Sequence, residues 1–306
     1  MDPLALPPQI RVIVRDWLNA NHILLKGRDA NVLIDSGYVS RARETLALLR
    51  EPRNLGGAPL DWLVNTHCHS DHMGGNAAIQ QAYQCRTSVP EGEAALIDAW
   101  DTRGLWLDYT GQDAQRFKLD DAIAAGQTIR WGDLDWKAIA APGHDAGALV
   151  FFCEEEGILI SGDALWEYGF GIVLPDVPAA MDDARRTLET IAALDVRVVI
   201  PGHGLPFTGV AAALERSFGR VEALRGNPER IARNVLKVML VFSLLDRESI
   251  PLATLPEYLN SVPIYREYNE RYLRQSAAQL ADRLVSELEK SGTVRRAGGM
   301  LLPAAV

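Results

Sequence analysis

The sequence has little cysteine, no long hydrophobic run and no excess of basic charge. Three cysteines in 306 residues, an odd number, form no disulfide framework and favour a reducing compartment. The longest apolar stretches, such as residues 238–245, are far shorter than the roughly 20 residues of a membrane-spanning helix. The start of the chain lacks a basic segment followed by an apolar one, so no signal peptide is predicted. We therefore expect a cytoplasmic protein without a membrane partner.

The acidic charge of the chain is unevenly distributed. The net charge is −9, and an acidic surface repels phosphate backbones, so nucleic acid is not expected as a partner. Residues 226–306 carry eleven Lys and Arg against nine Asp and Glu, a net charge of +2, which leaves −11 on residues 1–225. Since domains run to roughly 100–200 residues, this shift predicts a domain at 1–225 and a second at 226–306.

Hydrophobic periodicity predicts a mixed α/β chain up to about residue 210. The predicted strands are residues 10–14, 23–25, 31–34, 60–65, 128–131, 134–140, 148–153, 157–161 and 196–200. The predicted helices are residues 40–50, 74–83 and 179–194, and residues 91–125 are expected to be mostly helical. The first domain is therefore expected to be of the mixed α/β class.

The pattern beyond residue 225 is helical. Residues 228–245 have the hydrophobic spacing of one amphipathic helix, and residues 251–259 and 265–290 are also predicted to be helical. Two short apolar strands around a Gly-Gly turn follow in residues 292–303, and a helix before such a hairpin is typical of a winged-helix module. We expect this module to pack over a pocket or to form a homodimer rather than to read DNA.

Five of the six histidines stand in short motifs that suit metal coordination. Three lie in the run Thr66-His-Cys-His-Ser-Asp-His72, directly after a predicted strand, and the others lie in Pro-Gly-His motifs. Imidazole and carboxylate groups together suit zinc and similar divalent ions. The candidate ligands are His67, His69, Asp71, His72, His144, Asp163 and His203. Cys68 is expected to point away from this site as a packing residue, and His22 to be a hydrogen-bonded structural residue.

These motifs resemble those of metallo-β-lactamase-fold hydrolases, in the same order, over about residues 10–210. The matching pieces are Asn31-Val-Leu-Ile-Asp-Ser-Gly37, residues 66–72, Pro142-Gly-His144, Ser161-Gly-Asp163 and Pro201-Gly-His-Gly204. The resemblance implies an α/β fold, a four-layer αββα sandwich, with the metals at one edge between two sheets. The C-terminal helical, winged-helix-like domain would follow it.

The resemblance also assigns roles to the candidate ligands. It implies that His67, His69 and His144 hold a first divalent metal ion. It implies that Asp71, His72 and His203 hold a second ion and that Asp163 bridges the two. Asp35 is similar to an acid beneath the loop that fixes ligand orientation. Zn²⁺ is the expected ion, and Fe²⁺ or Mn²⁺ suit the same ligands.

The chemistry implied is that of a dinuclear metal-dependent hydrolase. A metal-bridging hydroxide would attack an ester, thioester or lactone carbonyl, with Asp71 orienting it and moving the proton. The bridging Asp163 resembles the glyoxalase II, lactonase and nuclease branches, whereas true β-lactamases usually lack it. The winged-helix-like tail is similar to that of the LACTB2-like hydrolases. One departure is Asp145, where many relatives have a hydroxyl residue after Pro-Gly-His.

Three alternatives stay open at this point. The first is a phosphodiesterase or nuclease of the same fold, the second a mono-iron persulfide dioxygenase, and the third a metal-stabilised scaffold without activity. The aromatic residues of segments 91–117 and 166–178 favour a pocket for a small acyl or lactone substrate over one for a polyanion. Trp106, Trp166 and Tyr168 are the expected substrate contacts.

Overall fold

Short apolar strands build two large β-sheets, and a third sheet of three strands lies in the C-terminal part, in a computed structural model that describes residues 4–177 and 179–304. Buried and exposed residues alternate along most of β8 (Leu134–Ala140), which therefore has one face against the core. β9 (Leu149–Cys153) and β10 (Ile158–Gly162) are buried along their whole length, as expected for strands covered on both faces. Residues 1–3, Pro178 and residues 305–306 lie outside the described part, together with the predictions that fall on them.

The two sheets have different strand directions. The first has the order β1-β2-β3-β4-β5-β6, antiparallel from β1 to β3 and parallel from β3 to β6. The second has the order β11-β10-β9-β8-β7, antiparallel except for the β10–β11 pair. The remaining strand bounds are β1 Ile10–Ile13, β2 His22–Lys26, β3 Asn31–Ile34, β4 Trp62–Val64, β5 Arg86–Pro90, β6 Asp121–Ile123, β7 Thr128–Trp131 and β11 Val198–Pro201.

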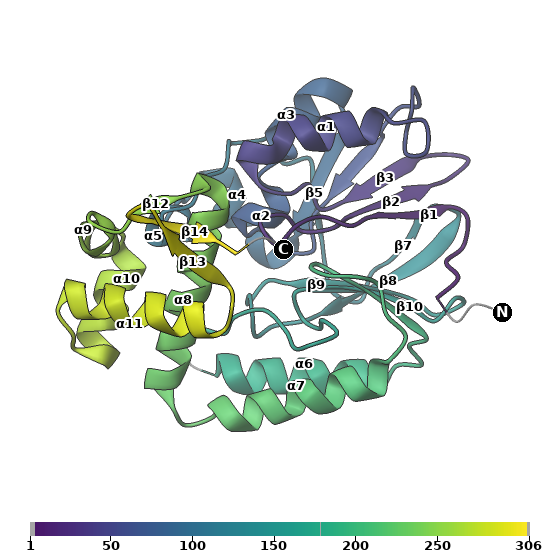
Figure 1. The fold of residues 1–306 in the computed structure, drawn as a ribbon. Coiled ribbons are helices and arrows are strands. Elements are labelled where there is room, and N and C mark those ends of the chain that lie inside the picture. Colours follow the sequence, from purple (N-terminus) through teal and green to yellow (C-terminus); the bar gives the residue numbers. More distant parts are fainter. Residues whose placement is uncertain (1–3, 178, 305–306) are drawn as a thin grey trace.

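Helices cover the outer face of each sheet and leave the inner faces packed together (Figure 1). α1 (Ala42–Arg50) and α3 (Asn76–Tyr83) lie on the first sheet, and α6 (Ala180–Ala192) and α7 (Val210–Leu224) lie on the second. The core between the sheets takes residues from both, among them Ile34, Trp136 and Phe151. The predicted αββα sandwich is confirmed by this layering.

Residues 91–125 differ from the prediction of a mostly helical segment. α4 (Glu91–Ala99) and α5 (Leu107–Thr110) are short, and β6 ends the segment as a strand. β5, immediately before α4, was not predicted at all. It pairs with strands on both sides and is buried after its first residue. Tertiary pairing therefore determines this segment, and its local sequence pattern does not.

The C-terminal part has its own apolar core. Its elements are α8 Pro228–Arg247, β12 Ile250–Pro251, α9 Leu255–Ser261, α10 Pro263–Tyr268, the π-helix Asn269–Leu273, α11 Ala277–Lys290, β13 Val294–Ala297 and β14 Met300–Pro303. The buried residues of this core lie between positions 224 and 301, with Tyr109 added from the sandwich. The winged-helix comparison and the division at residue 225 stay predictions.

Residues 265–290 are helical, as predicted, except for a break at residues 274–276. Arg274 has a positive φ of 53° and ends the π-helix. Ser276 then begins α11 with a capping box to Gln279, which satisfies the free amides of a new helix start. Among the described residues, no helix is both long enough and apolar enough to cross a membrane.

Candidate metal centre

The loop after β4 is held in place from below by Asp35. Asp35 follows β3 with a left-handed φ of 60°. Its carboxylate accepts hydrogen bonds from the backbone N and the Oγ1 of Thr66, each at 2.9 Å. His69 then precedes the short helix α2 (Ser70–Met73), whose first turn carries Asp71 and His72. The loop and the helix together direct the side chains of the run 66–72 toward one edge of the sandwich.

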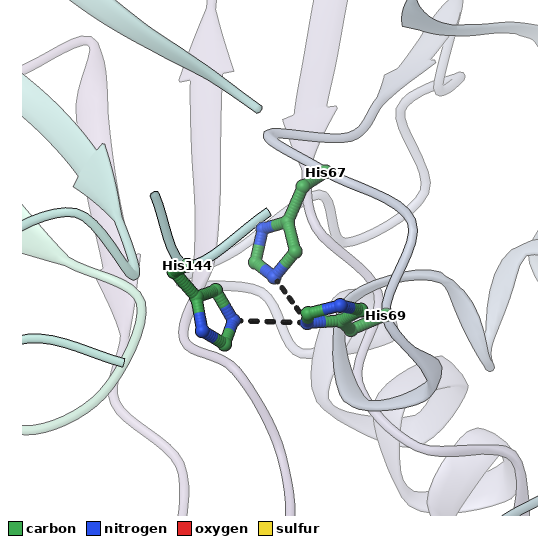
Figure 2. Close-up of side chains that lie close together, drawn as sticks. All are labelled: His67, His69 and His144. Carbon is green, nitrogen blue, oxygen red and sulfur yellow. Dashed lines mark hydrogen bonds between the residues drawn. The ribbon is translucent and has the colours of Figure 1, made fainter. Parts of the chain in front are cut away.

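Three imidazoles form the first ligand group. Figure 2 shows His67, His69 and His144 pointing toward one another, although His144 comes from a loop after β8. The Nδ1 of His69 lies 3.1 Å from His67 Nε2 and 2.9 Å from His144 Nε2. The Nδ1 of His144 donates to the carbonyl of Ile172 at 2.6 Å, so its Nε2 lone pair faces the group.

The second ligand group consists of Asp71, His72 and His203. Asp71 Oδ2 lies 3.1 Å from His203 Nε2. The Nδ1 of His72 lies 2.9 Å from Asp35, and its buried Nε2 makes no hydrogen bond, so it is open to a metal. Each of the two groups places its nitrogen and oxygen atoms within 4.8 Å of one another.

Asp163 lies between the two groups. Its Oδ1 is 3.2 Å from His72 Nε2 and 3.8 Å from His203 Nε2, whereas its Oδ2 is 3.5 Å from His144 Nε2. One carboxylate thus faces ligands of both groups. The structure brings all seven predicted ligands together, and their donor set fits two divalent ions.

The protonation of most ligands also suits metal binding. His72 is the exception, because the carboxylates of Asp35 and Asp163 outweigh its burial and hold its pKa well above the usual value, so it must release a proton to bind a metal. Burial, together with the neighbouring imidazoles, holds the pKa of His67 well below its usual value and lowers that of His69 to about 4. Although burial opposes it, the nearby His72 and His203 hold the pKa of Asp163 well below its usual value. Neutral imidazoles and ionised carboxylates are the forms that bind metal.

Two glycines allow the backbone to approach the ligands closely. A Cβ on Gly171 would lie 2.5 Å from His144 Nδ1, and a Cβ on Gly202 would overlap Asp163 Oδ1. Gly202 directly precedes His203, and the lack of a side chain at this position lets the backbone come close to the ligands.

Two tryptophans enclose the ring of His203. Trp17 stacks on it with ring centroids 5.5 Å apart and an angle of 4°, and Trp166 meets it edge-on at 5.3 Å. The Nε1 of Trp166 also donates to Asp163 Oδ1 at 3.3 Å. Trp17 was not predicted, because it stands in a loop that carries no motif and its aromatic ring was the only available signal.

The remaining predicted residues are placed as follows. Trp106 and Trp166 line the cavity beside the ligands, whereas Tyr168 is 77% exposed, has Arg216 over its ring and does not line it. Cys68 is buried in an apolar cluster, and burial raises its pKa well above the usual value. Asp145 Oδ2 lies 3.5 Å from His69 Nε2, so the departure from a hydroxyl residue places a carboxylate behind this ligand.

His22 is a structural residue, as expected. It is fully buried and contacts Arg15 Nη1 at 2.7 Å and Thr45 Oγ1 at 3.1 Å, both outside the ligand groups.

The cavity next to the ligands has a volume of about 660 Å³. The sandwich contributes His69, Asp71, His144, Asp163 and His203 to its wall, and the C-terminal part contributes α8 and residues beyond it. Segments 91–117 and 166–178 both supply lining residues, of which Trp106 and Phe170 are examples. The C-terminal part thus covers the pocket, one of the two arrangements expected for it.

Comparison with known proteins agrees with this geometry. The family model described as the metallo-beta-lactamase superfamily matches residues 15–203. The hydroxyacylglutathione hydrolase of Mesorhizobium japonicum is 25% identical over 193 residues, which are 60% of this chain and 67% of that protein. The enzyme of the same name from Brucella ovis is 27% identical over 138 residues, 45% of each chain. The chain thus matches less than half the length of the Brucella relative.

Solved structures extend the likeness in fold to almost the whole chain. A metallo-beta-lactamase family protein from Thermus thermophilus has a TM-score of 0.57 and 21% identity, covering 98% of this chain and 100% of that one. A beta-lactamase domain protein from Burkholderia ambifaria has a TM-score of 0.59 and 19% identity, covering 98% and 94%. At these identities the likeness concerns the fold alone, and it includes the C-terminal part.

Proposed function

Since the chain belongs to the metallo-beta-lactamase superfamily, we propose that it is a dinuclear metal-dependent hydrolase of small esters, thioesters or lactones. The observation that carries the proposal is the position of Asp163, whose two oxygens face the ligand groups on either side. Seven polar side chains that converge in a largely buried site are costly without an ion to bind them. Zn²⁺ is the proposed ion, because imidazole and carboxylate ligands suit it.

Two bound divalent ions lower the pKa of a bound water toward neutrality and polarise the carbonyl of the substrate. The chain supplies the rest. Asp71 Oδ2 lies at the cavity wall and is 3.1 Å from His203 Nε2, where it can take a proton from the attacking water and pass it to the leaving atom. Asp35 and the carbonyl of Ile172 hold the Nδ1 atoms of His72 and His144, respectively. The Nε2 atoms of both rings therefore stay directed toward the ligand groups.

The substrate class follows from the walls of the cavity. Trp106, Trp166 and Phe170 line it next to the ligands, and an apolar wall suits a carbonyl substrate with hydrocarbon groups. The relatives in the comparison are named as hydrolases of hydroxyacylglutathione, a thioester. Their name supports an acyl substrate for this chain as well.

The test combines metal analysis with a panel of substrates. Purified protein should contain two metal ions per chain and cleave S-acetyl-N-acetylcysteamine or a γ-lactone. His67→Ala should lower kcat by more than about 100-fold, since even residues behind metal ligands cost 10–100-fold. The matched control is Asp121→Asn, a half-buried residue of β6 paired with Arg86 and outside the ligand groups, which should behave as wild type.

Other outcomes would assign the chain to another branch of the superfamily. Two ions with cleavage of bis(p-nitrophenyl) phosphate alone would assign a phosphodiesterase. One iron per chain without hydrolysis, together with oxygen consumption on a persulfide, would assign a dioxygenase. Two ions without any activity would favour the scaffold.

A further inference from the structure

The cavity extends away from the ligands along one face of α8. Seven residues of α8 line it, and six of them are spaced three or four positions apart and therefore share that face, whereas Met239 lies at its edge and also belongs to the C-terminal core. The seven residues are Asn234, Lys237, Val238, Met239, Val241, Phe242 and Leu245. The opposite face, which includes Val235, Leu236 and Leu240, is fully buried in the C-terminal core. One helix thus supports a separate core and presents a second, largely apolar surface to the cavity.

We infer that this extension binds the hydrocarbon part of a medium-length acyl group, so that the substrate is an ester or thioester of an apolar acid. The inference rests on the proposed function, because the scissile carbonyl is placed at the metal ligands. Asp71 and His203 line the same cavity as Val238 and Leu288. A chain attached to a carbonyl at the ligands therefore extends toward α8 without leaving the cavity.

Exposed apolar side chains indicate where the hydrocarbon would lie. Val238 is 39% exposed and Trp17 is 51% exposed, and both line the cavity. Ile264 and Leu288 from α10 and α11 also line the cavity but are only 0% and 5% exposed, so Val238 and Trp17 provide most of the apolar surface that a ligand could cover. A hydrocarbon that covers these side chains removes apolar surface from water, which favours binding in proportion to the area covered.

The cations around the cavity argue against a polyanionic occupant. Lys237 Nζ is paired with Glu287 at 3.2 Å, and Arg15 Nη2 with Glu44 at 3.2 Å. The third cation, Arg220, donates to the carbonyl of Phe170 at 3.0 Å, and its guanidinium lies over the ring of the same residue. Each cation already has a partner within the chain, so an uncharged hydrocarbon matches this wall better than phosphates do.

A chain-length series tests the inference. The substrates are S-acyl-N-acetylcysteamine thioesters from acetyl to dodecanoyl. We expect kcat/KM to rise roughly fourfold for each added methylene group over part of the series, the factor expected for burial of one CH₂. The rise should end where the acyl chain fills the cavity, since 660 Å³ is a finite volume. A series that is flat, or in which acetyl is the best substrate, would overturn the inference.

Variants locate the effect on α8. Val238→Glu should flatten the chain-length series, because it places a charge where the hydrocarbon binds. Val238→Thr, which has nearly the same shape, should reduce the slope and also covers the case in which the Glu variant does not fold. The matched control is Val14→Glu, since Val14 is 43% exposed and lies outside the cavity lining. A wild-type slope in both Val238 variants would overturn the inference.

A binding assay separates this inference from the proposed function. N-Phenyl-1-naphthylamine, an uncharged dye, should bind to the His67→Ala variant and be displaced by 1-decanol. Val238→Glu should weaken the binding of the dye and the binding of 1-decanol. Dye binding without hydrolysis of any thioester or lactone would contradict the proposed function and support an apolar subsite. Hydrolysis without a chain-length effect and without dye binding would support the function and overturn the subsite.

Discussion

Replacement of Asp35 by Asn should weaken one of the two proposed metal sites selectively. Asn tolerates the left-handed conformation of this position well, so the backbone is expected to stay in place. The amide oxygen can still accept the hydrogen bond from Thr66 N. The new NH₂ group, however, replaces the oxygen that lies 2.9 Å from His72 Nδ1. Two donors then face each other, and His72 is driven to the tautomer with its proton on Nε2, the atom that faces the second ligand group.

The size of the effect follows from burial and from the bonds lost. Asp35 and His72 are both fully buried, so water does not replace the lost partner. Loss of a hydrogen bond to a charged group should lower the free energy of unfolding of the metal-free protein by about 1.5–3 kcal/mol. The affinity of the site made by Asp71, His72 and His203 should fall roughly 10–100-fold, the usual effect of a residue behind a ligand. The Thr66 hydroxyl can rotate, so the group containing His67 should change little.

The assay is a zinc titration of both proteins against a competing chelator, with chemical denaturation of the metal-free forms. One of the two binding constants should drop in Asp35→Asn, and Asp121→Asn, which lies outside the ligand groups, serves as the control. Unchanged constants, or an equal loss at both sites, would refute the assignment of Asp35 as the residue that orients His72.

Three further predictions follow from the same geometry. Trp166→Phe keeps a ring beside His203 but loses the donor to Asp163, so kcat should fall roughly fivefold, the equivalent of one hydrogen bond of about 1 kcal/mol. Steady-state kinetics at unchanged metal content measures this effect. An unaltered kcat would mean that the hydrogen bond has no role in catalysis. Gly202→Ala should lower the metal content of purified protein, because its Cβ would displace the carboxylate of Asp163, and elemental analysis showing full occupancy would contradict the close approach. Burial raises the pKa of Cys68 well above its usual value and that of Cys85 to about 11. Neither thiol should therefore react with Ellman's reagent at pH 8 until the protein is unfolded in guanidinium. Rapid reaction of the native protein would show that these thiols are accessible.

The metal ligands could be predicted from sequence because their signals are local. The run 66–72 holds four candidate ligands in one loop and the helix that follows it, and Pro-Gly-His or Ser-Gly-Asp marks each later one. Alternation along strands such as β8 is visible over seven residues and predicts the strands themselves, whereas the αββα layers were implied by the resemblance of the ligand motifs to metallo-β-lactamase-fold hydrolases. The match of the family model confirms the superfamily that these motifs resemble.

Features that depend on contacts between distant segments could not be predicted in the same way. β5 has the sequence Arg-Thr-Ser-Val-Pro, and its strand conformation comes from pairing with β4 and β6. The stacking of Trp17 on His203 joins residues 186 positions apart and leaves no periodic trace in the sequence. The break between the π-helix and α11 was not predicted, because the hydrophobic spacing continues across the capping box at the start of α11.

The shared wall of the cavity has a consequence for folding kinetics. Trp17, His203 and Leu288 line one cavity, so it closes only after segments from the whole length of the chain have met. Contacts between distant segments form slowly, because the entropy of closing long loops must be overcome first. During refolding, the helices and the loop 66–72 can therefore form well before the cavity does. Regain of catalytic activity should lag behind regain of far-ultraviolet circular dichroism, and the lag measures the docking of the C-terminal core onto the sandwich.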